Sequence, residues 1–225
     1  MKPSSYYDLS RVEESVRQGQ HRDVIGGLWD EIGDHQMQFL LQQGMKPNHR
    51  LLDIGCGSLR LGARAIAWLD HDRYFGTDIS KALIDAGRER ELTDQLRAKA
   101  PLENFSVSDD FDFDFLPAPV DFAIAQSVFT HLPINHLRRC LAKVAPHVRV
   151  GGSLFVTYFE CAPDQDLYAP LLHTPGAITT YDFKDPYHYR IADLVWAVDQ
   201  APWAFEPIGD WSHPRDQRIA RFRRL

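Results

Sequence analysis

The sequence predicts an α/β fold: a mostly parallel, doubly wound sheet with helices on both faces, within one domain of 225 residues. Three observations predict it. Short apolar runs alternate with segments of helical periodicity through the body of the chain. A glycine-rich turn directly follows the first apolar run. The length suits one large domain, and right-handed βαβ crossovers turn such alternation into a parallel sheet.

The composition is that of a globular protein, since 44% of the residues are hydrophobic and 25% are charged. A net charge of -6 disfavours general binding to nucleic acids or anionic membranes. Cys56, Cys140 and Cys161 are odd in number and far apart, which predicts a reducing compartment rather than disulfides. There is no long apolar run, and the N-terminal stretch is too polar for a secretory signal. We therefore expect a cytoplasmic monomer or homodimer without a membrane partner.

The first 47 residues predict a helical segment that caps the site. Apolar residues from Gly27 to Gly44 recur at helical spacing, and Gly44 supplies a stop. Residues 1–20 predict a further short helix or a partly ordered arm.

The first half of the body predicts three strands, each followed by a helix or a loop. Ser80 can cap the helix after the second strand, and Pro101 ends it. The predicted strands cover residues 50–54, 73–78 and 104–108, and the predicted helices cover 60–69 and 81–100.

The second half predicts a central strand over 120–125 and a helix over 133–144 that opens at a proline. Gly151 and Gly152 predict a turn before the next strand. A Pro-, Tyr- and His-rich stretch over 161–188 predicts a functional insertion, which we interpret as a substrate cap. The remaining predicted elements are a strand over 153–159, a helix over 191–198 and an antiparallel hairpin of 205–211 with 218–222.

The turn after the first strand carries the chemistry. Gly55 and Gly57 let the backbone approach a ligand, and Asp78 ends the next strand, where it should face a ribose. Arg60 stands where a dinucleotide motif has a glycine. Asp53 would repel a pyrophosphate but suits an ammonium group. The charge pattern therefore favours S-adenosylmethionine over NAD, although an NAD-dependent oxidoreductase stays open as an alternative.

These residues resemble a known family. Asp-Ile-Gly-Cys-Gly over 53–57, followed by Asp78, is similar to the nucleotide-binding half of class I S-adenosylmethionine-dependent methyltransferases. The resemblance covers about residues 48–160 and implies a Rossmann-like sheet of seven strands, which the C-terminal hairpin completes. Gln-Ser-Val-Phe-Thr-His-Leu over 126–132 resembles a stretch of bacterial small-molecule methyltransferases. One departure is Leu59, where the family commonly has a third glycine.

The resemblance also implies a binding site for S-adenosyl-L-methionine, with S-adenosyl-L-homocysteine as the product. The turn holds the methionine part, the end of the second strand binds the ribose, an acidic residue after the third strand lies by the adenine, and residues after the fourth strand form the floor. The implied residues are Asp53, Gly55, Cys56, Gly57, Ser58, Asp78, Ile79, Asp109, Asp110, Phe111, Gln126 and Ser127.

Methyl transfer from a sulfonium asks the protein chiefly for orientation, and a base is needed only when the accepting atom starts protonated. His131 after the fourth strand and Glu160 at the end of the fifth are the candidate catalytic residues. A helix-entry residue and a solvated strand end are the alternatives. Aromatic and histidine side chains are candidates for acceptor binding, although they could equally hold the long insertion in place: Tyr158, His173, Tyr181 and His188.

Other patterns are weaker. The alternating run over 110–115 taken alone predicts a half-buried strand, and its aspartates match no metal loop, so we predict no metal. The C-terminal arginines could bind RNA, but their alternation with apolar residues fits a solvated sheet face. We expect methyl transfer to oxygen or nitrogen of a small molecule. The alternatives are an RNA or protein acceptor, or a non-catalytic module that binds the cofactor.

Overall fold

A computed structural model describes residues 4–225, and its contacts form two compact units. The N-terminal unit is Asp8–Ala123; the C-terminal unit is Ile124–Leu225 together with the residues up to Tyr7. The single domain over 1–225 stays a prediction. None of the helices in residues 4–225 has the length and apolarity needed to cross a membrane.

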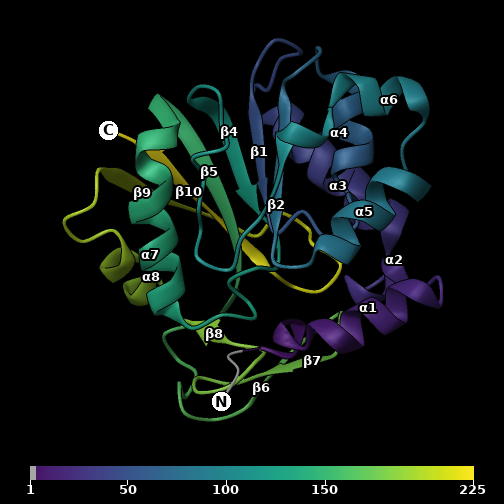
Figure 1. Cartoon of the computed structure of the whole chain (residues 1–225). Coiled ribbons are helices and arrows are strands. Elements are labelled where there is room, and N and C mark those ends of the chain that lie inside the picture. The colour runs from purple at the N-terminus through teal and green to yellow at the C-terminus, as the bar shows by residue number, and fades with distance from the viewer. Residues whose placement is uncertain (1–3) are drawn as a thin grey trace. The chain divides into compact units, whose positions relative to one another are not determined.

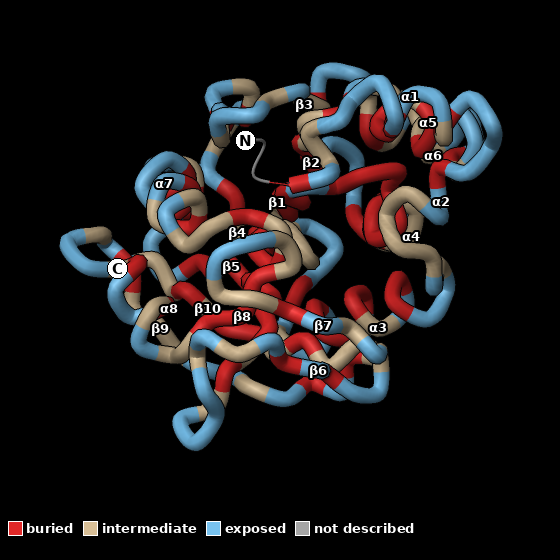
Figure 2. Tube along the Cα trace, turned by 90° about the horizontal axis from the view of Figure 1, so that it is seen from below, coloured by how far each residue is buried: buried red, intermediate tan, exposed pale blue. Residues whose placement is uncertain are grey.

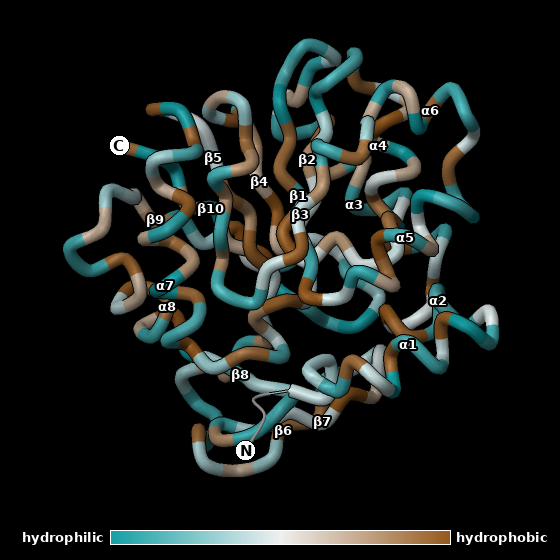
Figure 3. The backbone as a smooth tube through the Cα atoms, viewed as in Figure 1, coloured by the Kyte–Doolittle hydropathy of each residue, from teal (hydrophilic) through white to brown (hydrophobic). Residues whose placement is uncertain are grey.

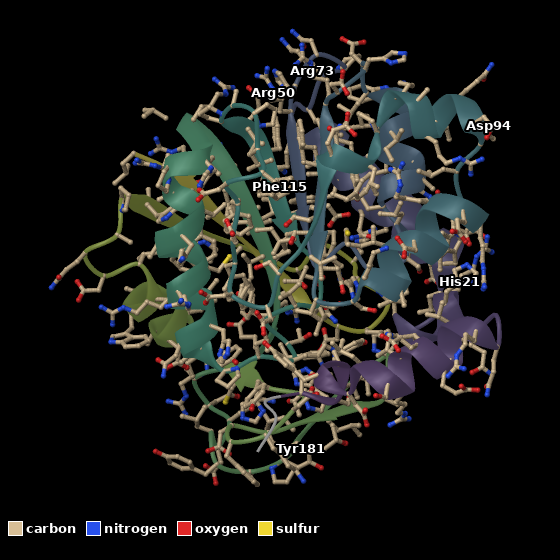
Figure 4. All side chains as sticks on the ribbon, viewed as in Figure 1. His21, Arg50, Arg73, Asp94, Phe115 and Tyr181 are labelled. Carbon is tan, nitrogen blue, oxygen red and sulfur yellow. The ribbon has the colours of Figure 1, made fainter. Side chains whose placement is uncertain are left out.

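The N-terminal unit contains three parallel strands: β1 (Leu51–Ile54), β2 (Tyr74–Asp78) and β3 (Phe105–Val107). β2 lies between the other two, so that Asp53 pairs with Gly76 and Asp78 pairs with Val107. Every residue of β1 is buried, and its hydrophobic colour stands out in Figure 3. At the other end of these strands, Figure 4 shows Arg50 and Arg73 close together, where the Leu51 amide donates to the Arg73 carbonyl. The three predicted strands are confirmed.

Helices accompany these strands (Figure 1): α3 (Trp29–Gln42), α4 (Gly62–Trp68), α5 (Lys81–Arg90) and α6 (Asp94–Lys99). The predicted cap is confirmed, since the Ser80 hydroxyl accepts a hydrogen bond from the Leu83 amide. The single helix predicted over 81–100 is wrong. It breaks before Thr93, because the Thr93 hydroxyl accepts from the Leu96 amide and caps a new helix. A short 3-10 helix, Leu102–Asn104, follows Pro101.

The predicted N-terminal helices are present as α1 (Leu9–Arg17), α2 (His21–Val24) and α3. α1 packs its apolar face on α5, where Val12 and Val16 meet Leu83 and Ala86. α3 begins two residues later than predicted, because Gly27 and Leu28 have left-handed backbone. A 3-10 turn, Ser5–Tyr7, belongs to the C-terminal unit, and the part of the prediction that falls on residues 1–3 lies outside the described residues.

The C-terminal unit begins within β4, at Ile124, and the strand order from there is β4-β5-β10-β9. β10 runs antiparallel to both neighbours, which confirms the C-terminal hairpin. Figure 2 shows β5 as largely buried, while β10 alternates between buried and half-buried residues. Together with the three strands of the N-terminal unit, these four give the seven expected strands. The elements are β4 (Val120–Ala125), α7 (Ile134–Val144), a 3-10 turn (Ala145–His147), β5 (Val148–Glu160), α8 (Ile191–Ala197), β9 (Trp203–Gly209) and β10 (Arg218–Arg224).

β5 is longer than predicted, and the expected turn at 151–152 is wrong. The strand continues through Gly151, which has φ +80° and lies exposed. A glycine can hold that conformation without a steric clash, so the strand need not end there. Pairing with β10 starts only beyond it, at Ser153.

The insertion over 161–188 is more ordered than a loop. It contains an antiparallel pair, β6 (Leu171–His173) and β7 (Ile178–Thr180), which Figure 1 shows next to β8. β8 (His188–Tyr189) pairs in parallel with the end of β5, so that Glu160 lies opposite Tyr189. The insertion is therefore tied to the edge of the sheet at which β5 ends.

The alternating run over 110–115 is not a strand. The Ser108 hydroxyl accepts hydrogen bonds from the amides of Asp110 and Asp112, and Phe111 between them has φ +56°. Such local side-chain bonds compete with sheet pairing and coil the chain. Only Phe113 of the run is buried.

Candidate functional site

The turn between β1 and α4 has an unusual backbone. Gly55, Gly57 and Leu59 have φ +71°, +53° and +67°, all in the left-handed region. Gly57 also has no room for a side chain, because a Cβ would lie 2.8 Å from Cγ2 of Ile25. Leu59 keeps the left-handed conformation although it is not a glycine, and its side chain is completely buried. The departure from the family pattern therefore changes the residue and keeps the shape of the turn.

Asp78, at the end of β2, holds this turn; that it faces a ribose stays a prediction. Its Oδ2 accepts a hydrogen bond of 2.9 Å from the Gly57 amide, and its Oδ1 accepts one of 2.8 Å from the Ser80 amide. Burial raises the pKa of Asp78, while these bonds and one from Ile79 act in the opposite direction. A carboxylate has about four acceptor positions, so the three bonds leave Asp78 about one position for a ribose hydroxyl.

Asp53 is a buried acid directly before the turn. It is only 3% exposed, and its Oδ2 accepts a hydrogen bond of 2.8 Å from the Tyr74 hydroxyl. Burial raises the pKa of Asp53 to about 7, although Tyr74 and Arg60 both lower it. A carboxyl group in this setting is stable as an anion near neutral pH when a cation compensates it. Tyr74 was not predicted, because a tyrosine in an apolar strand looks like core.

α2 and the chain between α2 and α3 contact the turn, although a role in capping the site stays a prediction. The Ser58 hydroxyl donates to the His21 carbonyl at 3.0 Å, and the Arg60 guanidinium donates to the Gly27 carbonyl at 2.9 Å. His21, visible in Figure 4 beside α2, is held in turn by Glu91 at 2.6 Å. Since its hydroxyl proton is engaged, the Ser58 side chain can only accept a hydrogen bond from a ligand and cannot donate one. The sequence did not predict that Arg60 holds the segment after α2 on the turn. Its partners are backbone carbonyls, which every residue type has, so no sequence pattern indicates them.

The remaining cofactor candidates of this unit surround the ends of β2 and β3. The Ser108 amide donates to the Asp78 carbonyl at 3.0 Å, which brings the loop with Asp109, Asp110 and Phe111 next to Asp78. Both aspartates are exposed and Phe111 is half-buried, as is Ile79. Burial raises the pKa of the Cys56 thiol, which is therefore a neutral wall of the turn. Their contacts with a cofactor stay predictions.

In the C-terminal unit, a polar cluster follows β4. The Gln126 side-chain amide nitrogen lies 3.1 Å from each of Ser127 Oγ, His213 Nε2 and Gln217 Oε1, and the Ser127 amide donates to Thr157 Oγ1 at 2.7 Å. Within residues 4–225, the buried Gln126 Oε1 has no hydrogen-bond partner. A buried acceptor without a partner suits a donor brought by a ligand. His213 and Gln217 come from the β9–β10 connection and were not predicted.

The two candidate bases lie in different settings. His131 Nδ1 donates to Asp185 Oδ1 at 2.5 Å, and the histidine side chain is 25% exposed. Glu160 is half-buried at the end of β5. Among the described residues, no hydrogen bond joins His131 and Glu160. Asp185 was missed, because an Asp-Pro pair in a loop predicts only a turn.

The acceptor candidates separate into three environments. His173 and His188 are bridged by the Thr180 hydroxyl at 2.9 and 2.8 Å, and His188 Nε2 also donates to the Leu167 carbonyl. Tyr158 is fully buried, and its hydroxyl has no partner within the described part of the chain. Tyr181 is labelled in Figure 4, and the Lys184 ammonium lies over its ring, 3.9 Å from the ring centroid. Their role in acceptor binding stays a prediction.

Comparison with known proteins agrees with this geometry. Residues 52–154 match the family model described as a methyltransferase domain. A TehB-like S-adenosylmethionine-dependent methyltransferase from Corynebacterium glutamicum is similar over 96% of this chain and 99% of its own, with 15% identity and a TM-score of 0.61. Magnesium protoporphyrin IX methyltransferase from Synechocystis, with bound S-adenosylhomocysteine, is similar over 87% and 85%, with 17% identity and a TM-score of 0.57.

A third similar structure is the glycopeptide N-methyltransferase MtfA with bound S-adenosylmethionine. It covers 86% of this chain and 94% of its own, with 14% identity and a TM-score of 0.60. Residues 52–154 are therefore similar to a methyltransferase domain, and the chain has the fold of the class I S-adenosylmethionine-dependent methyltransferases.

The left-handed turn predicts a reversed order of two substitutions at Leu59. Leu59→Ala should destabilise the protein by about 2–5 kcal/mol, because it removes a buried side chain. Leu59→Gly removes the same side chain but relieves the left-handed strain, so it should be about 1 kcal/mol more stable than Leu59→Ala. Urea unfolding measures both variants. Leu61 has no positive φ and serves as the control, where the alanine variant should be more stable than the glycine variant. If Leu59→Gly is less stable than Leu59→Ala, the strain at Leu59 is refuted.

The raised pKa of Asp53 predicts a pH dependence of stability. Because the folded state favours the protonated acid, the Asp53 carboxyl group stabilises the folded protein fully below about pH 4. This stabilisation is lost as the pH rises through about 7. In the ligand-free state, raising the pH from 4 to 7.5 should therefore lower the free energy of unfolding of wild type by about 2–4 kcal/mol more than that of Asp53→Asn. Urea unfolding of both proteins across this range measures it. Parallel stability curves would contradict the assignment.

Proposed function

We propose that this protein transfers a methyl group from S-adenosylmethionine to an oxygen or nitrogen of a small-molecule acceptor. The observation that carries the proposal is the buried Asp53 carboxyl group, next to a bare glycine turn that Asp78 holds. The methionine part of the donor brings an ammonium group, which can form the direct ion pair that Asp53 does not make within residues 4–225, where Arg60 acts on it only through its charge. The residues present therefore fit the cofactor.

When bound, S-adenosylmethionine supplies a methyl group on a good leaving group. The chain supplies binding, orientation and proton management. Gly55 offers an exposed backbone, Asp53 offers a buried carboxyl group that has no direct ion pair within residues 4–225, and Asp78 offers a remaining acceptor position to the ribose. Asp109 or Asp110 with Phe111 is assigned to the adenine, and Gln126 with its unpartnered Oε1 to a ligand donor. His131 accepts the proton of an acceptor that starts protonated, with Glu160 as the alternative base.

Two observations support a small-molecule acceptor over RNA. The arginines of β10 are engaged on the sheet: Arg221 and Arg223 lie 3.5 Å from Glu206, and Arg218 pairs with Asp210 at 3.0 Å. Arginines used in this way are less suited to phosphates. Among the similar structures, one is a magnesium protoporphyrin IX methyltransferase and one a glycopeptide N-methyltransferase. A cytoplasmic location, a monomeric or homodimeric state and the absence of a nucleic-acid partner remain predictions.

The cofactor site predicts that Asp53→Ala and Asp78→Ala each weaken binding of S-adenosylmethionine by about 1–3 kcal/mol, or roughly 5- to 150-fold in Kd. Each variant removes a carboxylate that meets either the ammonium group or the ribose. Isothermal titration calorimetry measures the change. Glu89→Ala removes an exposed acid of α5 and serves as the control, for which affinity should stay unchanged. Unaltered affinity in both test variants would contradict the assignment of the cofactor site to Asp53 and Asp78.

The acceptor is identified with a donor that carries a deuterated methyl group. The purified protein is incubated with this donor and a metabolite extract, and mass spectrometry searches for acceptors that gain the label while S-adenosylhomocysteine accumulates. Labelling of a hydroxyl or amine compound supports the proposal. Label in RNA or protein fractions with salt-sensitive binding would move the acceptor to a macromolecule. Cofactor binding without transfer to any fraction would indicate a non-catalytic module.

A further inference from the structure

His131 is held by a carboxylate from a distant part of the chain. Its Nδ1 lies 2.5 Å from Oδ1 of Asp185, at the end of the insertion, and the two side chains are 25% and 16% exposed. Within the described residues, Nε2 of His131 has no hydrogen-bond partner. One ring nitrogen is thus occupied, and the other has no protein partner within the described residues.

The partner of Nδ1 sets the tautomer of the ring. An ionised carboxylate only accepts hydrogen bonds, so the proton of neutral His131 must lie on Nδ1. Nε2 then carries the lone pair and can take up a proton. When it does, the neighbouring negative charge stabilises the imidazolium that forms.

Asp185 is itself positioned from the start of the chain. Its Oδ2 accepts hydrogen bonds from the Ser4 hydroxyl at 2.9 Å and the Ser5 amide at 3.4 Å, and the Tyr6 ring meets the His131 ring edge-on at 4.9 Å. Burial raises the pKa of Asp185, but the bonds from His131, Ser4 and Ser5 outweigh burial and lower it. The carboxylate therefore stays ionised at neutral pH, as the tautomer argument requires.

A backbone hydrogen bond also joins the two segments that carry Asp185 and His131. The Tyr187 amide donates to the Thr130 carbonyl at 2.7 Å, which ties the residues after Asp185 to the residues before His131. A pair whose two members are each held by separate contacts is preorganised, since neither has to be ordered when it acts.

We propose that Asp185 is the positioning residue for His131 as the general base of this methyltransferase, and that Ser4 locks Asp185 in place. The inference rests on the proposed function. In the reaction, the acceptor's lone pair forms the bond to the methyl carbon, and the sulfur keeps the electron pair of the bond that breaks. The acceptor's O–H or N–H proton passes to Nε2 of His131, and the imidazolium later releases it to solvent.

The first test observes the tautomer without any reaction. In ¹⁵N-labelled protein, the imidazole signals of His131 are assigned by their loss in His131→Gln, and their shifts report which nitrogen carries the proton. Wild type should show the proton on Nδ1. Asp185→Asn should shift the ring towards the Nε2–H form, because an amide can donate to Nδ1. Asp164→Asn, an exposed acid of the same insertion, is the matched control and should leave the signals unchanged.

The second test measures turnover with the acceptor that the labelling experiment identifies. Asp185→Asn should lower kcat about 10²- to 10⁴-fold, as expected when a general base is lost, while Kd for S-adenosylmethionine changes less than about threefold. Ser4→Ala should lower kcat in the same direction by a smaller factor, and Asp164→Asn should match wild type. Unfolding and circular dichroism check that each variant is folded.

The outcomes separate the two proposals. A shifted tautomer with reduced kcat supports the positioning role. An unchanged tautomer in a folded Asp185→Asn protein, or a shifted tautomer with wild-type kcat, overturns it and leaves the methyltransferase proposal intact. If labelling finds no acceptor, the proposed function fails, and the base role of the pair fails with it even where the tautomer is as expected.

Discussion

The structure of the N-terminal unit depends on the turn between β1 and α4. Its backbone must adopt left-handed conformations at Gly55, Gly57 and Leu59 and must leave room for Ile25 at Gly57. The hydrogen bond from the Gly57 amide to Asp78 ties this turn to the end of β2. The turn, the end of β2 and the segment after α2 meet at this point. A small change in the turn is therefore expected to move the groups of this unit that are assigned to the cofactor.

The burial of Asp53 exchanges stability for binding. Taking a carboxyl group out of water without a cation disfavours its ionised form, which costs folding free energy near neutral pH. The same burial makes the site respond strongly to an ammonium group, since a charge pair gains more in a poorly solvated site. A site of this kind is stable enough to fold and remains unsatisfied until its ligand arrives.

The C-terminal unit assembles its polar groups from segments far apart in the chain. The end of β4 contributes Gln126 and His131, the β9–β10 connection contributes His213, and the insertion contributes Asp185. Each of these residues alone looks like an ordinary polar side chain. Their chemistry arises from the partners, because a hydrogen bond decides which nitrogen of a histidine is free and which oxygen of an amide is left without a donor.

The sequence by itself determined the strands, the order of helices around them, the glycine turn and the placement of Asp78, because these follow from local patterns of apolar residues and glycines. It did not determine the break before Thr93 or the coil over 110–115, where a single hydroxyl outweighs the periodicity. Only the tertiary structure decided the roles of Tyr74, Arg60 and Asp185. Their partners are far away along the chain or are backbone carbonyls, and a linear pattern holds no record of either.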